Sequence, residues 1–171
     1  ENLRFGKRHQ MSFQIRSPSV KIAIAEESVM GTDGGASFEV AELFDDGVDT
    51  AAVGLGTSAS ARTDATFRAR ATAADSIVRV KVSTVTADNS SDDPYHLIVD
   101  VADRPLAGRA PPTSQIELKV RKSSPALGII RQLDSRLIGM RFVAELRWFA
   151  GKDEPELHWH LSADSSDVVL A

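Results

Sequence analysis

The sequence predicts a mainly β protein, an antiparallel β-sandwich or flattened barrel of about eight strands with one short helix. Stretches of alternating apolar and polar residues recur along the chain, and turn residues separate them at intervals of roughly 8 to 12 residues. The composition is that of an ordinary globular protein, with 42% apolar and 26% charged residues. A chain of 171 residues is long enough for one domain with its own core.

The clearest pattern covers residues 140–162, where two alternating stretches flank a turn that contains Gly151 and Pro155. This pattern is typical of a β-hairpin, although a helix running through Met140, Ala144 and Trp148 would also fit. The alternation and the partner strand that follows at once favour the hairpin. Because the apolar faces must lie on the same side of the sheet, one register predicts these cross-strand pairs: Leu146 with Trp159, Trp148 with Leu157, Glu145 with His160, Arg147 with His158 and Arg141 with Asp164.

Residues 66–72 and 78–83 predict a second hairpin, connected at Ala74 and Asp75. A two-residue loop sets Arg70 opposite Arg79 and Arg68 opposite Lys81. Four positive charges then share one outer face.

Further elements follow from the same signals. Strands are expected at residues 20–25, from Phe38 to the turn at 45–47, at 97–101 and at 116–120, whereas residues 48–64 fit a loop or a strand of small residues. The single helix is expected from Leu127 to Leu137, with Ser124 as its cap, Pro125 at its first position and Gly139 at its end.

Residues 1–10 resemble a degenerate protease-site tag, so they are interpreted as a tag remnant or disordered arm before a single domain at 11–171. We see no apolar run of about 18 residues, as a membrane span needs, and no signal peptide. The absence of cysteine excludes disulfides, thiolate metal sites and a cysteine nucleophile. This composition fits the cytoplasm or the interior of an assembled particle, and it is also compatible with a processed secreted form.

The basic face is the first candidate site. Like charges directly opposite one another destabilise a sheet unless an anion or carboxylates offset them. The face could bind an anion, an acidic protein or nucleic acid, or neighbouring Asp and Glu residues could simply neutralise it. The net charge of -4 and the lack of aromatic residues there argue against a general polyanion or single-strand binder. Its members are Arg68, Arg70, Arg79 and Lys81.

The second candidate is a metal site on the hairpin. His158 and His160 alternate along one strand, so their imidazoles point the same way, and Glu145 or Asp164 could add a third ligand. The alternative is two surface histidines in ordinary cross-strand pairs.

Two weaker motifs complete the inventory. The loop with Asp88, Asn89, Asp92 and Asp93 offers oxygen ligands for calcium but lacks EF-hand spacing, which favours a solvated turn. Asn89 also begins a glycosylation sequon, relevant only to a secreted chain. The glycine-rich residues 54–59 are not followed by the helix that a dinucleotide site needs.

These observations favour a non-enzymatic module that binds another macromolecule or assembles with copies of itself. By analogy of fold class alone, it could be a scaffold, virion or tail subunit. No catalytic constellation is apparent and no cofactor is expected. The alternatives are a metal-binding barrel that uses the His-x-His pair, or a carrier of a small ligand.

Overall fold

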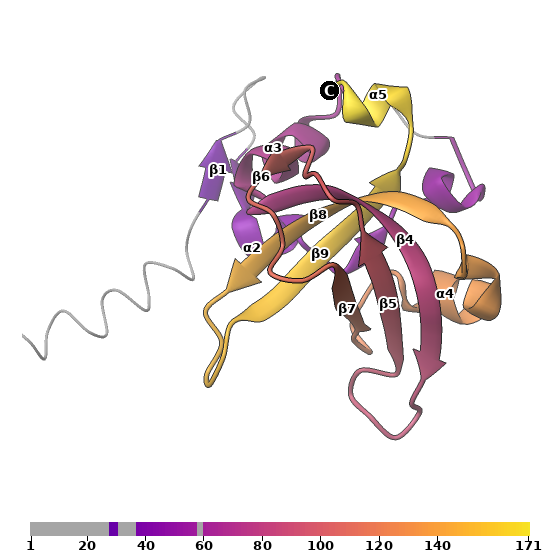
Figure 1. Ribbon diagram of the computed structural model, residues 1–171. Coiled ribbons are helices and arrows are strands. Elements are labelled where there is room, and N and C mark those ends of the chain that lie inside the picture. The colour runs from indigo at the N-terminus through magenta and orange to yellow at the C-terminus, as the bar shows by residue number, and fades with distance from the viewer. Residues whose placement is uncertain (1–27, 31–36, 58–59) are drawn as a thin grey trace, which may run out of the picture.

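The computed structural model describes residues 28–30, 37–57 and 60–171 (Figure 1). Its main element is a seven-stranded sheet, curled like half a barrel, with the strand order β3-β9-β8-β4-β5-β7 and with β6 paired to β4. The pairing of β3 with β9 is parallel, and all other pairings in this sheet are antiparallel. The strands are β3 (Gly47–Val48), β4 (Ser76–Ala87), β5 (Tyr95–Val101), β6 (Ala107–Gly108), β7 (Gln115–Val120), β8 (Arg141–Phe149) and β9 (Glu156–Ala163).

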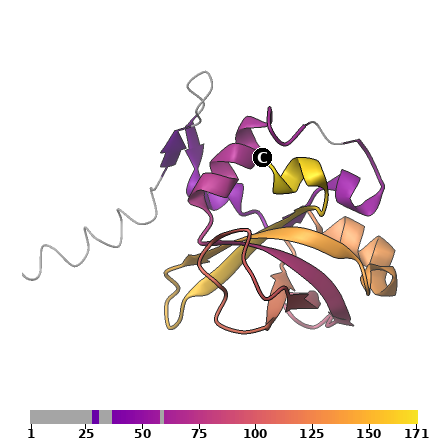
Figure 2. The same cartoon turned by 45° about the horizontal axis from the view of Figure 1, so that its top comes forward.

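Short helices lie on both sides of this sheet, and a separate two-stranded ribbon pairs β1 (Ser28–Met30) with β2 (Ser37–Glu39). Figure 2 shows α2, α3 and α5 gathered on one side of β8 and β9, while α4 packs with the apolar side of the sheet. The helices are α2 (Val40–Leu43), α3 (Ala65–Ala73), α4 (Leu127–Leu133) and α5 (Ser166–Val169), with 3-10 turns η1 (Thr50–Val53) and η2 (Asp134–Leu137).

The mainly β prediction is confirmed, but a clean antiparallel sandwich is not what forms. The sheet is mixed because β3 runs parallel to β9, and the chain has several short helices instead of one. The helices α2, α3 and α5, which we call the helical layer, lie against β8 and β9 in place of further strands.

The main core fills the curl of the sheet. Trp159 is fully buried there among aliphatic side chains from β4, β5, β7 and β8, and Ile130 and Leu133 of α4 pack into the same cluster. The indole Nε1 of Trp159 donates to the carbonyl of Lys119 at 3.1 Å. This bond joins β9 to β7, the last strand of the sheet, and so links the two sides of the curl.

The predicted register of the 140–162 hairpin is confirmed. In the structure Leu146 lies opposite Trp159 and Glu145 opposite His160, and the pairs Arg147 with His158 and Trp148 with Leu157 also form. The paired strands end at Ala163, and the next residue, Asp164, bonds Arg79 of β4 at 3.0 Å. Asp164 therefore pairs with Arg79, and not with Arg141 as the register predicted.

The predicted hairpin of residues 66–72 with 78–83 is wrong, because residues 65–73 form the helix α3. The side chain of Asp64 accepts hydrogen bonds from the backbone N–H groups of Thr66 and Phe67, which caps the helix, and alanine favours its interior. The helical period is disguised because one of its buried positions is an arginine, Arg70. Strand β4 pairs with β8 and β5 instead, which sets Lys81 opposite Arg141.

The predicted helix after Pro125 is found as α4 followed by η2, and Gly139 follows it at a φ of 88°. The predicted start is wrong, because α4 begins at Leu127 with Ala126 at its N-cap position instead of Ser124. Strands at 97–101 and 116–120 are found as β5 and β7. The strand expected after Phe38 gives way to α2 at Val40, and residues 48–64 include η1. The expected strand at 20–25 and the tag-like residues 1–10 lie outside the described residues.

Two fully buried serines allow a direct test of the packing. Within the described chain the hydroxyl of Ser76 has no hydrogen-bond partner, whereas that of Ser162 donates to Glu145 at 3.0 Å. Removing an unsatisfied buried hydroxyl is nearly neutral or stabilising, but removing a donor to a buried carboxyl group costs about 1 to 3 kcal/mol. We expect Ser76→Ala to preserve or raise the free energy of unfolding in urea and Ser162→Ala to lower it. Equal losses in both variants would contradict this assignment.

Candidate functional site

The polar face of the β8–β9 hairpin is covered by the helical layer. Glu145 and Ser162 are fully buried and His160 is 6% exposed, although the alternating pattern had placed them on an outer face. Val40, Leu43 and Phe44 pack with Ala69 and Ala73 of α3 in a second, smaller core over this face. The structure thus corrects the interpretation of His160 as a surface residue.

Five ionisable side chains and one serine lie beneath this layer. We call them the His160 cluster, and its members are Asp45, Asp49, Arg70, Glu145, His160 and Ser162. The Nδ1 atom of His160 lies 2.8 Å from Asp45 Oδ1, and its Nε2 atom lies 3.2 Å from Asp49 Oδ1. Strand β3 explains this arrangement, because its parallel pairing sets Gly47 beside His160 and places an aspartate on either side of the ring.

Burial and charge shift the pKa values within the His160 cluster. Burial raises the pKa of Glu145 to about 7, despite the opposing charges of His160 and Arg70. Burial alone would lower the pKa of His160, but its hydrogen bonds to Asp45 and Asp49 outweigh that effect and raise it. For Asp45 and Asp49, burial is likewise outweighed by the imidazolium, which lowers both pKa values.

These shifts define the charge state in which the cluster is balanced. With Glu145 protonated, the cations Arg70 and His160 face the anions Asp45 and Asp49. Buried charges are tolerated when they are paired in this way. Ionisation of Glu145 adds a third carboxylate to a cluster that has only two cations.

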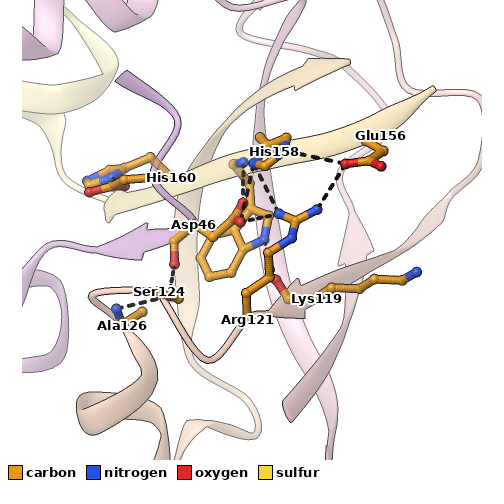
Figure 3. A network of polar contacts seen from close by, with 10 residues as sticks. Asp46, Lys119, Arg121, Ser124, Ala126, Glu156, His158 and His160 are labelled. Carbon is orange, nitrogen blue, oxygen red and sulfur yellow. Dashed lines mark hydrogen bonds and ion pairs between the residues drawn. The ribbon is translucent and has the colours of Figure 1, made fainter. Parts of the chain in front are cut away.

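A second polar network lies further along β9 and joins it to the chain after β7 (Figure 3). The Nη1 atom of Arg121 lies 2.5 Å from Asp46 Oδ2 and 3.1 Å from His158 Nδ1, and its Nη2 atom lies 3.4 Å from Glu156 Oε2. Asp46 is 4% exposed and also accepts the backbone N–H of Trp159 at 3.2 Å. The hydroxyl of Ser124 donates to the Asp46 carbonyl at 2.6 Å, so this network fixes α4 as well.

Beside this network a groove of about 610 Å³ runs between β7 and the β8–β9 turn. Charged side chains dominate its walls. We call it the β7 groove, and it is lined by Asp93, Glu117, Lys119, Arg121, Lys152, Asp153, Glu154, Pro155, Glu156 and Leu157.

The structure does not bring the four predicted basic residues together as a strand face. Arg70 is buried in the His160 cluster, and Arg68 lies on α3. Arg79 and Lys81 stay on β4 near Arg141, where Asp100 and Asp164 line the same shallow pocket. Carboxylates therefore accompany the positive charges of Arg79 and Lys81, which fits the alternative that neighbouring Asp and Glu residues neutralise them.

The proposed metal ligands are each engaged by other partners. Both ring nitrogens of His160 lie against carboxylates, His158 belongs to the Arg121 network, and Glu145 accepts from Ser162. Among residues 28–30, 37–57 and 60–171 there is no group of three or more His, Cys, Asp and Glu residues that could hold a metal ion. In the candidate calcium loop, Asp88 accepts hydrogen bonds from Ser90, and Asp92 pairs with Lys122.

Sequence reasoning missed three aspartates and one arginine that build these networks. Asp45 and Asp46 had been interpreted only as part of a turn, and Asp49 and Arg121 were not singled out. A usable signal was the dense set of aspartates around Gly47, since a buried histidine needs such partners. The contacts of Asp45 and Asp49 with His160 depend on the parallel pairing of β3 with β9, which no local sequence pattern predicts.

Comparison with protein-family models, curated proteins and solved structures finds no match to this chain. No helix in the part of the chain that the structure describes is long and apolar enough to cross a membrane.

The His160 cluster predicts an unusual dependence of stability on pH. Between pH 4.5 and about 7 the folded state keeps the Glu145 proton that the unfolded state releases, so the free energy of unfolding falls as pH rises, by about 3 kcal/mol in all. Above 6.5 the raised pKa of His160 adds to this fall. Below 3.8 the lowered pKa values of Asp45 and Asp49 reverse the slope.

Glu145→Gln, which mimics the protonated form, should remove most of the fall between pH 4.5 and about 7. Urea unfolding across this range measures it, with Glu154→Gln on the exposed turn as the matched control. An unchanged slope in Glu145→Gln would contradict the assignment of the buried proton.

Proposed function

We propose that this chain is a binding module and not an enzyme, and that it takes up an extended segment of a partner protein along the outer edge of β7. The observation that supports this proposal is the position of β7. It is the last strand of the sheet, it pairs with β5 on one side, and the β7 groove opens on the other. Free strand edges beside a groove are the usual platform for strand addition.

The backbone of β7 has groups oriented towards the groove. The carbonyl of Lys119 accepts from the indole of Trp159, which lies on β9 and not on β5, so this carbonyl points away from β5 and is already hydrogen-bonded. In an antiparallel pair the N–H and C=O of one residue point to the same side and alternate residues repeat that direction. The N–H groups of Lys119 and Glu117 therefore face the edge where an added strand would lie.

The charge of the β7 groove favours a basic segment. Its walls hold five carboxylates and three cations, and one of the cations, Arg121, is already engaged by buried Asp46. An acidic partner or the phosphates of nucleic acid would meet this excess of negative charge. The carboxylates are those of Asp93, Glu117, Asp153, Glu154 and Glu156.

A second copy of the chain is the other candidate for the same edge. Antiparallel pairing of β7 with its counterpart, in a register centred on Leu118, would set Glu117 opposite Lys119 of the second copy in both directions. This arrangement satisfies a two-fold axis and the preference for opposite charges in cross-strand pairs.

The test uses a labelled peptide that alternates valine and lysine, followed by fluorescence anisotropy. We expect it to bind, and a valine–glutamate peptide to bind at least about tenfold more weakly, because of the groove's charge. Lys119→Pro removes the outward N–H and should abolish binding while leaving the circular dichroism spectrum unchanged, since proline is tolerated on a free edge. Lys119→Ala keeps the N–H and is the matched control.

Two outcomes would overturn the proposal. Lack of binding to the lysine peptide, or equal binding by Lys119→Pro and Lys119→Ala, would exclude strand addition at β7. A dimer mass in light scattering that Lys119→Pro abolishes would assign the edge to a second copy instead of a different partner.

A further inference from the structure

A second cavity lies in the helical layer, on the other side of β9 from the main core. It has a volume of about 260 Å³ and is lined by residues of η1, α3, α5 and the end of β9, together with Thr57, Ala61 and Asp64 between η1 and α3. These elements cluster together above the sheet in Figure 2. The polar side chains in its wall that matter here are Asp49, Asp64, Arg70, Ser165 and Asp167.

Arg70 has donors left over for this cavity. The residue is 7% exposed, and its Nε donates to the Leu43 carbonyl at 2.6 Å. Within the described residues that is its only hydrogen bond, and Arg70 lines the cavity. The Nη groups of a guanidinium form a fork that matches a carboxylate in two parallel hydrogen bonds. Neither Nη atom is among the fully buried atoms that lack a partner, so both are accessible, and the cavity that Arg70 lines is where a ligand would reach them.

The carboxylates around the cavity restrict what that ligand can be. Asp64 is used as the cap of α3, and Asp167 accepts from the Ala61 N–H at 2.8 Å and the Ser60 hydroxyl at 3.2 Å. Asp49 faces His160. All three still contribute negative charge, which repels a dianion such as phosphate and attracts a cationic group. An anionic ligand would pair only with Arg70, and a cationic ligand would pair only with the aspartates.

We propose that this cavity binds a small zwitterion of the amino-acid class, with its carboxylate on the Nη groups of Arg70 and its ammonium group towards Asp49 and Asp167. The volume suits such a molecule, because it falls just below the range of about 300 to 1,000 Å³ for larger ligands. Phe67 and Val168 supply apolar surface for a short side chain. The site is separate from the β7 groove, so it does not depend on the function proposed above.

The experiment is titration calorimetry of the full chain with L-alanine as the probe. Acetate carries only the carboxylate and methylamine only the ammonium group. Inorganic phosphate tests for a general anion site. We expect alanine to bind at least about tenfold more tightly than either half-probe, the difference expected when one charge-assisted hydrogen bond is lost. Phosphate should not bind.

Two variants locate the binding. Arg70→Lys keeps the charge but loses the fork, and Asp167→Asn keeps an acceptor for Ala61 but loses the charge, so each should weaken alanine binding by about tenfold. Asp153→Asn, in the β7 groove, is the control and should bind normally. Asp167→Asn tests the site even if Arg70→Lys fails to fold. Absence of alanine binding, equal binding of acetate, or an unchanged affinity in Asp167→Asn would overturn the proposal.

Discussion

The fold depends on the burial of both faces of one hairpin. The apolar face of β8 and β9 packs into the main core around Trp159, and the polar face is covered by the helical layer. A polar face can be buried only if its charges are paired. The segment around β3 therefore brings Asp45 and Asp49 to Glu145 and His160, and α3 brings Arg70.

The segment around Gly47 connects the two sides of the molecule. Its parallel pairing with β9 directs Asp45 and Asp49 to His160, while Asp46, at a φ of 55°, turns to Arg121 and the backbone of Trp159. One short strand thus fixes the buried cluster on one side and the wall of the β7 groove on the other. We expect a substitution in the His160 cluster to alter the β7 groove through this segment.

The sequence predicted what depends on local alternation. The register of β8 with β9 could be deduced because period two and the alignment of apolar faces leave few choices, and Leu146 does face Trp159. Helix α3 was missed because Arg70 occupies a buried position and Phe67, Ala69 and Ala71 happen to alternate. The covering of Glu145 and His160 could not be predicted, since it depends on a parallel contact and on residues far away in the sequence.

Titration of the His160 ring nitrogens by ¹⁵N NMR tests directly whether the buried cluster is ionic. We expect an imidazolium with both nitrogens protonated that persists above the ordinary pKa of 6.5, with ring protons that exchange slowly because Asp45 and Asp49 accept their hydrogen bonds. Titration at or below 6.5, or rapidly exchanging ring protons, would contradict a buried ion cluster at His160.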